Sequence, residues 1–362
     1  MSKYDIWFSS VRLSTKIKLK IFKKFKHSEA IWKYCMSKEK AFNELEDEKP
    51  LKDTLIKYWN EEKIKYYERI IKINSIKIVN YFDVLYPSRL KVYEDSPCIL
   101  FYRGNIEKLN STKTVSIVGS RNSSFYGENV TNILGKELSE RGISIISGMA
   151  KGIDSIAHNS CINNSGFTCA VLGCGVDVIY PKANKNLYNR ICNSGCVLSE
   201  FIPTTKPYAY NFPLRNRIIS ALGDLVIIVE ANKKSGSLIT ASYALQQGKE
   251  VMAVPGSILS NRSIGTNNLI KDGAYPLTTI EDVFNILKIE YIYKNEEKIS
   301  FSNNLEKNIY SIIGSNPVHI NDILRICNID IKQLYGVLFE LQLKNQITCL
   351  SGNYYVRIAN SV

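Results

Sequence analysis

The sequence predicts an α/β fold built on a parallel sheet, with a helical domain before the sheet and a small mixed domain after it. Three observations support this prediction. Short β-branched runs alternate with helical stretches in residues 111–285, the first 80 residues have helical spacing, and a charged stretch precedes the final segment. Apolar runs that do not alternate with polar residues are typical of strands covered on both faces.

Six such runs are expected to form a doubly wound sheet with helices on both sides. They are residues 114–118, 143–146, 168–172, 197–199, 225–229 and 251–254. Ligands of such sheets bind at the carboxyl ends of the strands, so the loops that follow these runs are the candidate site.

Residues 1–80 are expected to form an N-terminal helical domain of the SAM-like or helix-hairpin-helix-like kind. Ser14 can cap a helix that runs to Phe25, because Ile17, Ile21 and Phe25 recur at four-residue steps. The lysines of this helix suit a solvated face better than a contact with phosphates.

The remaining boundaries are a core over residues 81–287, a linker over 288–302 and a last domain over 303–362. In that domain we expect helices at 305–313, 320–327 and 331–345, then a hairpin of 347–350 and 354–358 turning at Ser351-Gly352-Asn353. Three helices followed by a hairpin outline a winged helix.

A formal net charge of +13 favours polyanionic partners, although a lysine-rich surface can also serve only solubility. The nine cysteines include no Cys-x-x-Cys pair, so we expect mostly buried free thiols and no metal site. No apolar run reaches the roughly 18 residues of a membrane helix, and the start has no signal-peptide pattern. These features predict a cytoplasmic protein without a membrane partner.

The first predicted strand leads into Gly119-Ser120-Arg121 and then a helix near Tyr126. A turn that feeds a helix N-terminus favours an anion, and Arg121 adds a planar charge. The next loops contain Asp154 and His158, which we expect to pair on one helical face, and Lys182, which we expect at the same rim as Arg121.

The segment from Phe212 to Arg217 is the most informative. Phe212 precedes Pro213 and is expected to be extended. We expect that Arg215 and Arg217 are not both buried in the core and that they face a ligand. Salt bridges from these arginines to Glu200 or Glu230 are an equally weighted alternative. An aromatic ring beside guanidinium groups suits single-stranded nucleic acid. A further anion site is expected where a helix begins, at the residues Ser235, Gly236 and Ser237.

Several segments, in order over about residues 81–283, resemble the DNA-processing protein A family (DprA, also called Smf). They include Ile117-Val118-Gly119-Ser120-Arg121, Ser147-Gly148-Met149-Ala150, Phe212-Pro213 through Ile219, and Ser235-Gly236-Ser237-Leu238-Ile239-Thr240-Ala241. The resemblance implies an extended Rossmann-like core with a winged-helix tail. It also implies a homodimer that binds single-stranded DNA, protects incoming DNA and loads the RecA recombinase on it during natural transformation.

By the same resemblance, the DNA-binding residues lie in the first loop, in the aromatic–arginine segment and at the second helix start. One lysine is added, although its match to the family is less close. They are Gly119, Ser120, Arg121, Phe212, Arg215, Asn216, Arg217, Ser235, Gly236, Ser237 and Lys182. No cofactor or catalytic residue is implied. In this chain Tyr208 and Tyr210 lie where some relatives carry a basic residue just before the Phe-Pro pair.

Two alternatives from other classes remain. Nucleotide phosphoribohydrolases share such a core, but their Pro-Gly-Gly segment supplies a catalytic glutamate, whereas here Pro255-Gly256 precedes Ser257 and Gly265-Thr266 precedes Asn267. A transcription factor would read duplex DNA through the helix at 331–345, which offers few basic or amide side chains.

Overall fold

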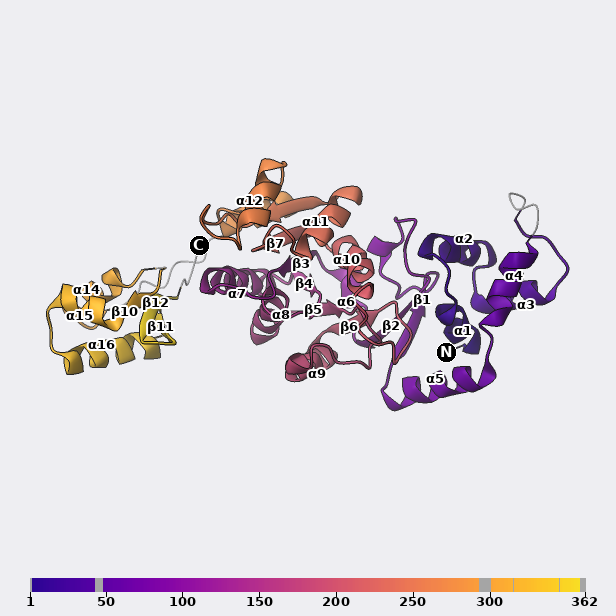
Figure 1. Ribbon diagram of the computed structural model, residues 1–362, viewed down its shortest axis with the longest axis horizontal. Coiled ribbons are helices and arrows are strands. Elements are labelled where there is room, and N and C mark those ends of the chain that lie inside the picture. The colour runs from indigo at the N-terminus through magenta and orange to yellow at the C-terminus, as the bar shows by residue number, and fades with distance from the viewer. Residues whose placement is uncertain (1, 43–47, 293–300, 315, 345, 359–362) are drawn as a thin grey trace.

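The computed structural model describes residues 2–42, 48–292, 301–314, 316–344 and 346–358. Figure 1 shows the N-terminal helices at one end of the long axis, the core in the middle and the winged-helix domain at the other end. No helix within the described ranges is long and apolar enough to cross a membrane.

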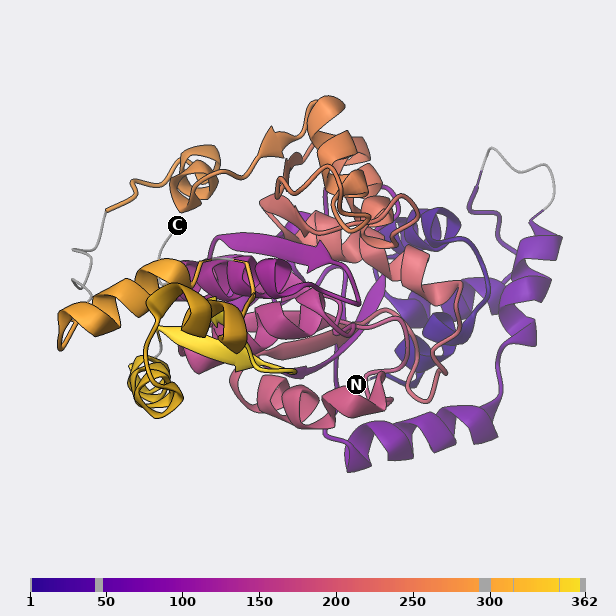
Figure 2. The same cartoon turned by 60° about the vertical axis from the view of Figure 1, so that its left-hand side comes forward.

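The N-terminal region consists of five helices, which Figure 2 shows packed against the core on the side away from the winged helix. They are α1 (Lys3–Ser10), α2 (Thr15–Phe25), α3 (Ser28–Met36), α4 (Lys49–Lys57) and α5 (Glu61–Ile73). The predicted cap is confirmed, because the Ser14 side chain accepts a hydrogen bond from the Ile17 amide.

The core contains a nine-stranded sheet in the order β1-β2-β6-β5-β4-β3-β7-β8-β9. The six predicted strands are confirmed to within one residue at each end, and all are parallel to their neighbours in that group. They are β3 (Thr114–Gly119), β4 (Ser144–Ser147), β5 (Thr168–Val171), β6 (Cys196–Ser199), β7 (Leu225–Val229) and β8 (Glu250–Ala253).

Three strands were not predicted from the sequence, and two of them extend the sheet in the antiparallel sense. They are β1 (Lys77–Asn80), β2 (Ile99–Gly104) and β9 (Tyr275–Pro276). Strand β2 pairs antiparallel with both β1 and β6, so the sheet is mixed at this edge. Strand β9 pairs parallel with β8 at the other edge.

Helices cover both faces of the sheet, which explains why its strands read as continuous apolar runs. Side chains from α7, α8 and α13 pack with Val115 and Ile117 on one face, and side chains from α10 and α11 pack with Val118 and Ile228 on the other. The core helices are α6 (Lys108–Ser111), α7 (Phe125–Glu140), α8 (Ile153–Asn163), α9 (Lys185–Ser194), α10 (Asn211–Leu222), α11 (Ser237–Gln246), α12 (Ile264–Lys271) and α13 (Ile280–Leu287).

The winged-helix domain has its own hydrophobic core and a small sheet in the order β10-β12-β11. Its elements are α14 (Asn304–Ile312), β10 (Val318–His319), α15 (Ile320–Cys327), α16 (Ile331–Leu343), β11 (Ile347–Leu350) and β12 (Tyr354–Arg357). The predicted linker at 288–302 falls mostly on residues 293–300, outside the described ranges.

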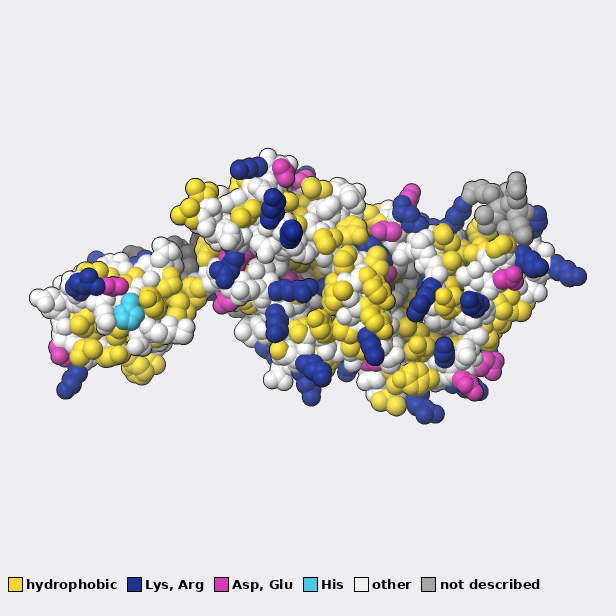
Figure 3. Space-filling view, viewed as in Figure 1, with side chains coloured by type: hydrophobic (Ala, Val, Ile, Leu, Met, Phe, Trp, Pro, Cys, Tyr) yellow, Lys and Arg dark blue, Asp and Glu magenta, His cyan; other side chains and the backbone are white. Residues whose placement is uncertain are grey.

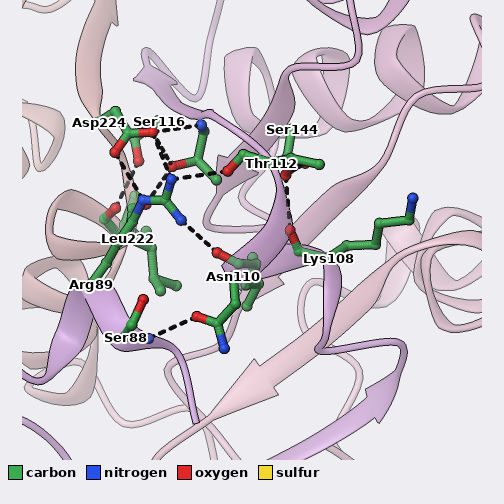
Figure 4. Close-up of polar contacts among 12 residues, drawn as sticks. Ser88, Arg89, Lys108, Asn110, Thr112, Ser116, Ser144, Leu222 and Asp224 are labelled. Atoms are coloured by element: carbon green, nitrogen blue, oxygen red, sulfur yellow. Dashed lines mark hydrogen bonds and ion pairs between the residues drawn. The ribbon is translucent and has the colours of Figure 1, made fainter. Parts of the chain in front are cut away.

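A partly buried ion pair joins the connection between β1 and β2 to the amino end of β3 (Figure 4). Arg89 donates to both carboxylate oxygens of Asp224 at 2.8 Å and to the carbonyl of Thr112 at 2.9 Å. Asp224 in turn accepts from the Thr114 amide at 2.9 Å. This contact fixes the end of the sheet opposite to the candidate site.

Candidate nucleic-acid interface

A cavity of about 650 Å³ opens where β3 ends and where α10 and α11 begin. Nine of the eleven candidate residues line it, so the sequence prediction that separate loops converge is supported by their position. These nine are Gly119, Ser120, Arg121, Phe212, Arg215, Asn216, Ser235, Gly236 and Ser237.

The half-buried ring of Phe212 lines the cavity, and the guanidinium groups of two arginines lie near it. The guanidinium carbon of Arg121 lies 5.9 Å from the ring centroid, and that of Arg215 lies 5.8 Å from it. The ring of Tyr180 lies 5.5 Å away at 39°. Because Arg121 is exposed and Arg215 is buried, only Arg121 presents its charge to solvent.

Phe212 is the second residue of α10 and therefore helical, so the expectation of an extended conformation was wrong. Proline in the first turn of a helix is tolerated because that turn has no amide bonds to lose. Gly173 lies against the ring, since a Cβ there would come within 2.8 Å of Phe212 Cδ1. The backbone thus fixes the position of the ring.

Arg215 is only 5% exposed, and so is Arg217, which makes the expectation that they would not both be buried wrong. Arg215 donates from Nη1 to the carbonyls of Gly148 and Val171 at the ends of β4 and β5, and from Nε to Asn216. Burial lowers the pKa of Arg215 to about 10, although nearby Asp154 favours the charged form.

Arg217 faces away from the cavity. Its Nη2 lies 2.5 Å from Glu200 Oε2, and its Nε lies 3.8 Å from Asp95 Oδ2. For Arg217 the predicted alternative of an internal salt bridge to Glu200 is therefore the one that the structure has. Burial raises the pKa of Glu200, and Arg217 opposes that shift. We therefore assign Arg217 a structural role.

The first loop depends on close backbone approaches. A Cβ on Gly119 would lie 1.8 Å from the Val229 carbonyl oxygen, so only glycine fits beside β7. The Ser120 hydroxyl accepts from the Asn122 amide at 3.2 Å, which holds the turn that projects Arg121. The sequence of this loop thus determines where the exposed cation lies.

The second helix start is joined to the aromatic segment by Asn216, which donates to the Gly236 carbonyl at 3.3 Å. The first amides of this helix are already bonded within the turn, so the expected anion site on them is not supported. The Ser237 amide donates to Ser235 Oγ at 3.4 Å, the Leu238 amide to the Ser235 carbonyl at 3.2 Å and the Ile239 amide to the Gly236 carbonyl at 3.2 Å. Lys234 and Asn232 also line the cavity and were missed from the sequence. The lysine pair 233–234 directly before a serine-glycine helix start is the signal that could have found Lys234.

Lys182 begins a short 3₁₀ turn (Lys182–Asn184), is exposed and lies outside the cavity lining.

The expected pairing of His158 with Asp154 was wrong. His158 Nδ1 lies 2.6 Å from Thr168 Oγ1, while Asp154 accepts from the amide of Gly148 at 3.2 Å. Burial lowers the pKa of His158 to about 3, with Arg215 adding to the effect, so the imidazole is neutral.

Six of the nine cysteines are buried, as expected. Among the described residues, no group of three or more His, Cys, Asp or Glu side chains is arranged to hold a metal ion.

Comparison with known proteins gives matches over both the core and the winged helix. The family model for DNA recombination-mediator protein A matches residues 77–288, and that for the DprA winged helix domain matches residues 300–353. The DNA processing protein DprA of Bacillus subtilis (strain 168) is 44% identical over 199 residues, which span 55% of this chain and 67% of that protein.

Two solved structures resemble the whole fold or its core. The X-ray structure of DNA processing protein A from Streptococcus pneumoniae has a TM-score of 0.65 at 32% identity, covering 81% of this chain and 99% of that one. A Helicobacter pylori structure, described as giving insights into a single-stranded DNA binding mode, has a TM-score of 0.54 at 31% identity and covers 59% and 95%. The chain belongs to the DNA recombination-mediator protein A family, in which the DprA and Smf proteins are found.

Proposed function

We propose that this chain binds single-stranded DNA in the cavity at the start of α10. The observation that carries the proposal is the exposed Arg121 guanidinium beside the half-buried Phe212 ring, 5.9 Å from its centroid. Single-strand sites combine such aromatic platforms with cations that meet the phosphates.

In this mechanism a base stacks at Phe212 while neighbouring phosphates meet the exposed Arg121 and Lys234. The buried guanidinium of Arg215 is already bonded within the protein and does not bind a phosphate of the DNA. It holds α10 against the ends of β4 and β5, and so fixes the ring on which the base stacks. Lys182 lies outside this cavity and would meet a phosphate only beyond it.

Family membership supports the finer parts of the proposal. We infer that the protein is a homodimer that protects incoming DNA and loads RecA on it during natural transformation. Sedimentation velocity tests the dimer. The growth of RecA filaments on DNA coated with single-strand-binding protein, with and without this chain, tests loading, and equal rates would contradict it.

An enzymatic function is not favoured. Three residues after Gly265-Thr266, where the phosphoribohydrolases carry a catalytic glutamate, this chain has Leu269. Asn267 in the same segment holds the backbone of Gly256, accepting from its amide at 3.2 Å and donating to its carbonyl at 3.0 Å. Neither a leucine side chain nor a carboxamide can serve as a general acid or base. Incubation with nucleoside monophosphates should release no base.

Reading of duplex DNA by α16 is also not favoured. One exposed stripe of this helix is apolar at four-residue steps, at Ile331, Tyr335, Phe339 and Leu343. Beside it, the exposed polar side chains of the described residues 331–344 are only Lys332, Gln333, Glu340 and Lys344. Lys344 pairs with the buried Glu306 at 2.5 Å. Recognition of base edges requires basic and amide side chains on that face.

The substitution Arg121→Ala tests the site. We expect about a tenfold loss of affinity for oligothymidylate and a salt slope reduced in magnitude by about 0.7, the value for one phosphate on a single strand. The matched control is Lys113→Ala, which removes an exposed cation just before β3, at the opposite end of the same strand. Equal binding by the two variants, in a fluorescence titration at two ionic strengths, would remove this cavity from consideration.

A further inference from the structure

A second and larger cavity, of about 1050 Å³, lies between the N-terminal helices and the core. Its walls are the end of α1 with the turn after it, the junction of α4 and α5, and the loop before α10. We call it the interdomain cleft. It is not part of the site described above, and no candidate residue except Arg217 lines it.

The interdomain cleft is strongly basic. Six cationic side chains line it against one carboxylate, Glu200, which is already paired with Arg217. Lys18 is directed inward and donates to the carbonyls of Ser9 and Val11. Four exposed cations remain, and across the described parts of the chain none of them forms an ion pair. They are Arg12, Lys57, Lys63 and Lys206.

Aromatic rings accompany these cations. Tyr208 and Tyr210 stack on each other with ring centroids 5.4 Å apart and planes at 5°, and they are 46% and 65% exposed. Because neither ring is buried in the protein, the outer faces of both rings are available for stacking. Figure 3 shows hydrophobic side chains gathered over α10 with lysine and arginine side chains around them.

One segment separates the interdomain cleft from the first cavity. Along it, Pro207 and Ala209 line the first cavity, while Tyr208 and Tyr210 line the cleft. Farther on, Phe212 and Arg215 face the first cavity, whereas Asn211 and Leu214 face the cleft. The wall is therefore a single stretch of chain, and a polymer that leaves the first cavity over it enters the cleft.

We propose that the interdomain cleft is a second subsite for the same DNA strand, which continues from the Phe212 cavity over the stacked tyrosines. This inference rests on the proposed binding of single-stranded DNA. Free cations in the cleft meet the phosphates, and the outer tyrosine faces meet the bases, so the cleft adds affinity without reading sequence. The N-terminal helices then act as one wall of the DNA path.

The test compares two double charge reversals with the same change in net charge. Lys57→Glu with Lys63→Glu alters the cleft. Lys65→Glu with Lys72→Glu alters exposed positions of α5 outside it. Binding is titrated with oligothymidylates of about 6 nucleotides, near the short end of the site sizes of single-strand grooves, and of about 20 nucleotides, beyond their long end of about 16. On the long oligonucleotide the cleft variant should lose about tenfold in affinity relative to the control, with a salt slope smaller by about 1.4.

On the short oligonucleotide, which the Phe212 cavity alone accommodates, the cleft variant and its control should bind equally. Equal affinities on the long oligonucleotide would overturn the proposal. Failure of the underlying function gives a different result, because Arg121→Ala would then leave binding of the short oligonucleotide unchanged.

An uncharged variant provides a second readout. Tyr208→Ala with Tyr210→Ala should weaken binding of the long oligonucleotide by at least about fivefold with an unchanged salt slope, since stacking and not charge is removed. Tyr208→Phe with Tyr210→Phe should bind like the natural sequence. A loss in the phenylalanine variant equal to that in the alanine variant would contradict stacking at this wall.

Discussion

At the scale of single residues, the site separates arginines that face a ligand from arginines that hold the protein together. Arg121 is exposed on a turn, whereas Arg215 and Arg217 are each 5% exposed and lie in α10. Arg215 bonds to carbonyls at two strand ends, and Arg217 bonds to Glu200. Buried cations persist only where such partners satisfy them.

The substitution Arg215→Met should therefore destabilise the fold. It leaves the Gly148 and Val171 carbonyls without a donor and the buried Asp154 without its nearby cation, and loss of one partner of a buried pair costs about 3–5 kcal/mol. Urea unfolding measures the change in the free energy of unfolding. Arg121→Met is the control and should be neutral. Equal stability of the two variants would mean that Arg215 is not a structural residue.

The sequence predicted which residues meet at the cavity but not what each one does there. Loops after parallel strands converge by topology, so Arg121 and Phe212 could be placed together. The partners of Arg215 lie 44 and 67 residues away in the chain, and no local pattern indicates that they surround it. The two carbonyls that bond to Arg215 and the two carboxylates that pair with Arg217 come together only in the folded protein.

At the scale of elements, strands buried on both faces could be predicted to within one residue, because only such strands show unbroken apolar runs. The antiparallel strands β1 and β2 were not predicted. Strand β2 was missed although it contains the buried apolar run Ile99-Leu100-Phe101-Tyr102. Its partner β6 follows it by more than 90 residues, so its antiparallel place in the sheet could not be predicted from its own sequence. The connection between β1 and β2 is held by the pair of Arg89 and Asp224, which lie 135 residues apart.

The Arg89–Asp224 pair should make stability depend on pH in acid. Burial opposes ionisation of Asp224, but Arg89 and the Thr114 amide outweigh it and lower the pKa of the carboxyl. A lowered carboxyl pKa stabilises the fold above the unfolded-state value of about 3.9, and the contribution is lost as pH falls through the folded-state value. The stability difference between the natural sequence and Arg89→Ala should therefore be full at neutral pH and shrink in acid.

Urea unfolding across that pH range measures the difference. Lys16→Ala is the control, because Lys16 and Glu94 form a highly exposed pair that contributes little at any pH. A difference between the natural sequence and Arg89→Ala that stays constant down to strong acid would show that Asp224 is not the group responsible.

At the scale of the whole molecule, the packing divides into two units that differ from the three visible in Figure 1. The N-terminal helices share one continuous hydrophobic core with the α10 and α11 face of the sheet. Phe22 of α2 illustrates this, since its ring stacks on Phe8 at 5.7 Å and on Phe82, outside the helices, at 5.8 Å. The winged helix, in contrast, has a core made only of its own residues. This packing predicts that the interdomain cleft lies within one cooperatively folding unit.

Calorimetry should accordingly show two unfolding transitions, each sensitive to a different large-to-small substitution. Phe22→Ala creates a cavity in the shared core and should lower the midpoint of the transition of the helices and sheet together, at a cost of about 3–5 kcal/mol. Leu338→Ala, in α16, should lower only the other transition, by about 2–5 kcal/mol. If Phe22→Ala instead split a third transition from the sheet, the N-terminal helices would fold independently and the cleft would be a joint between separate domains.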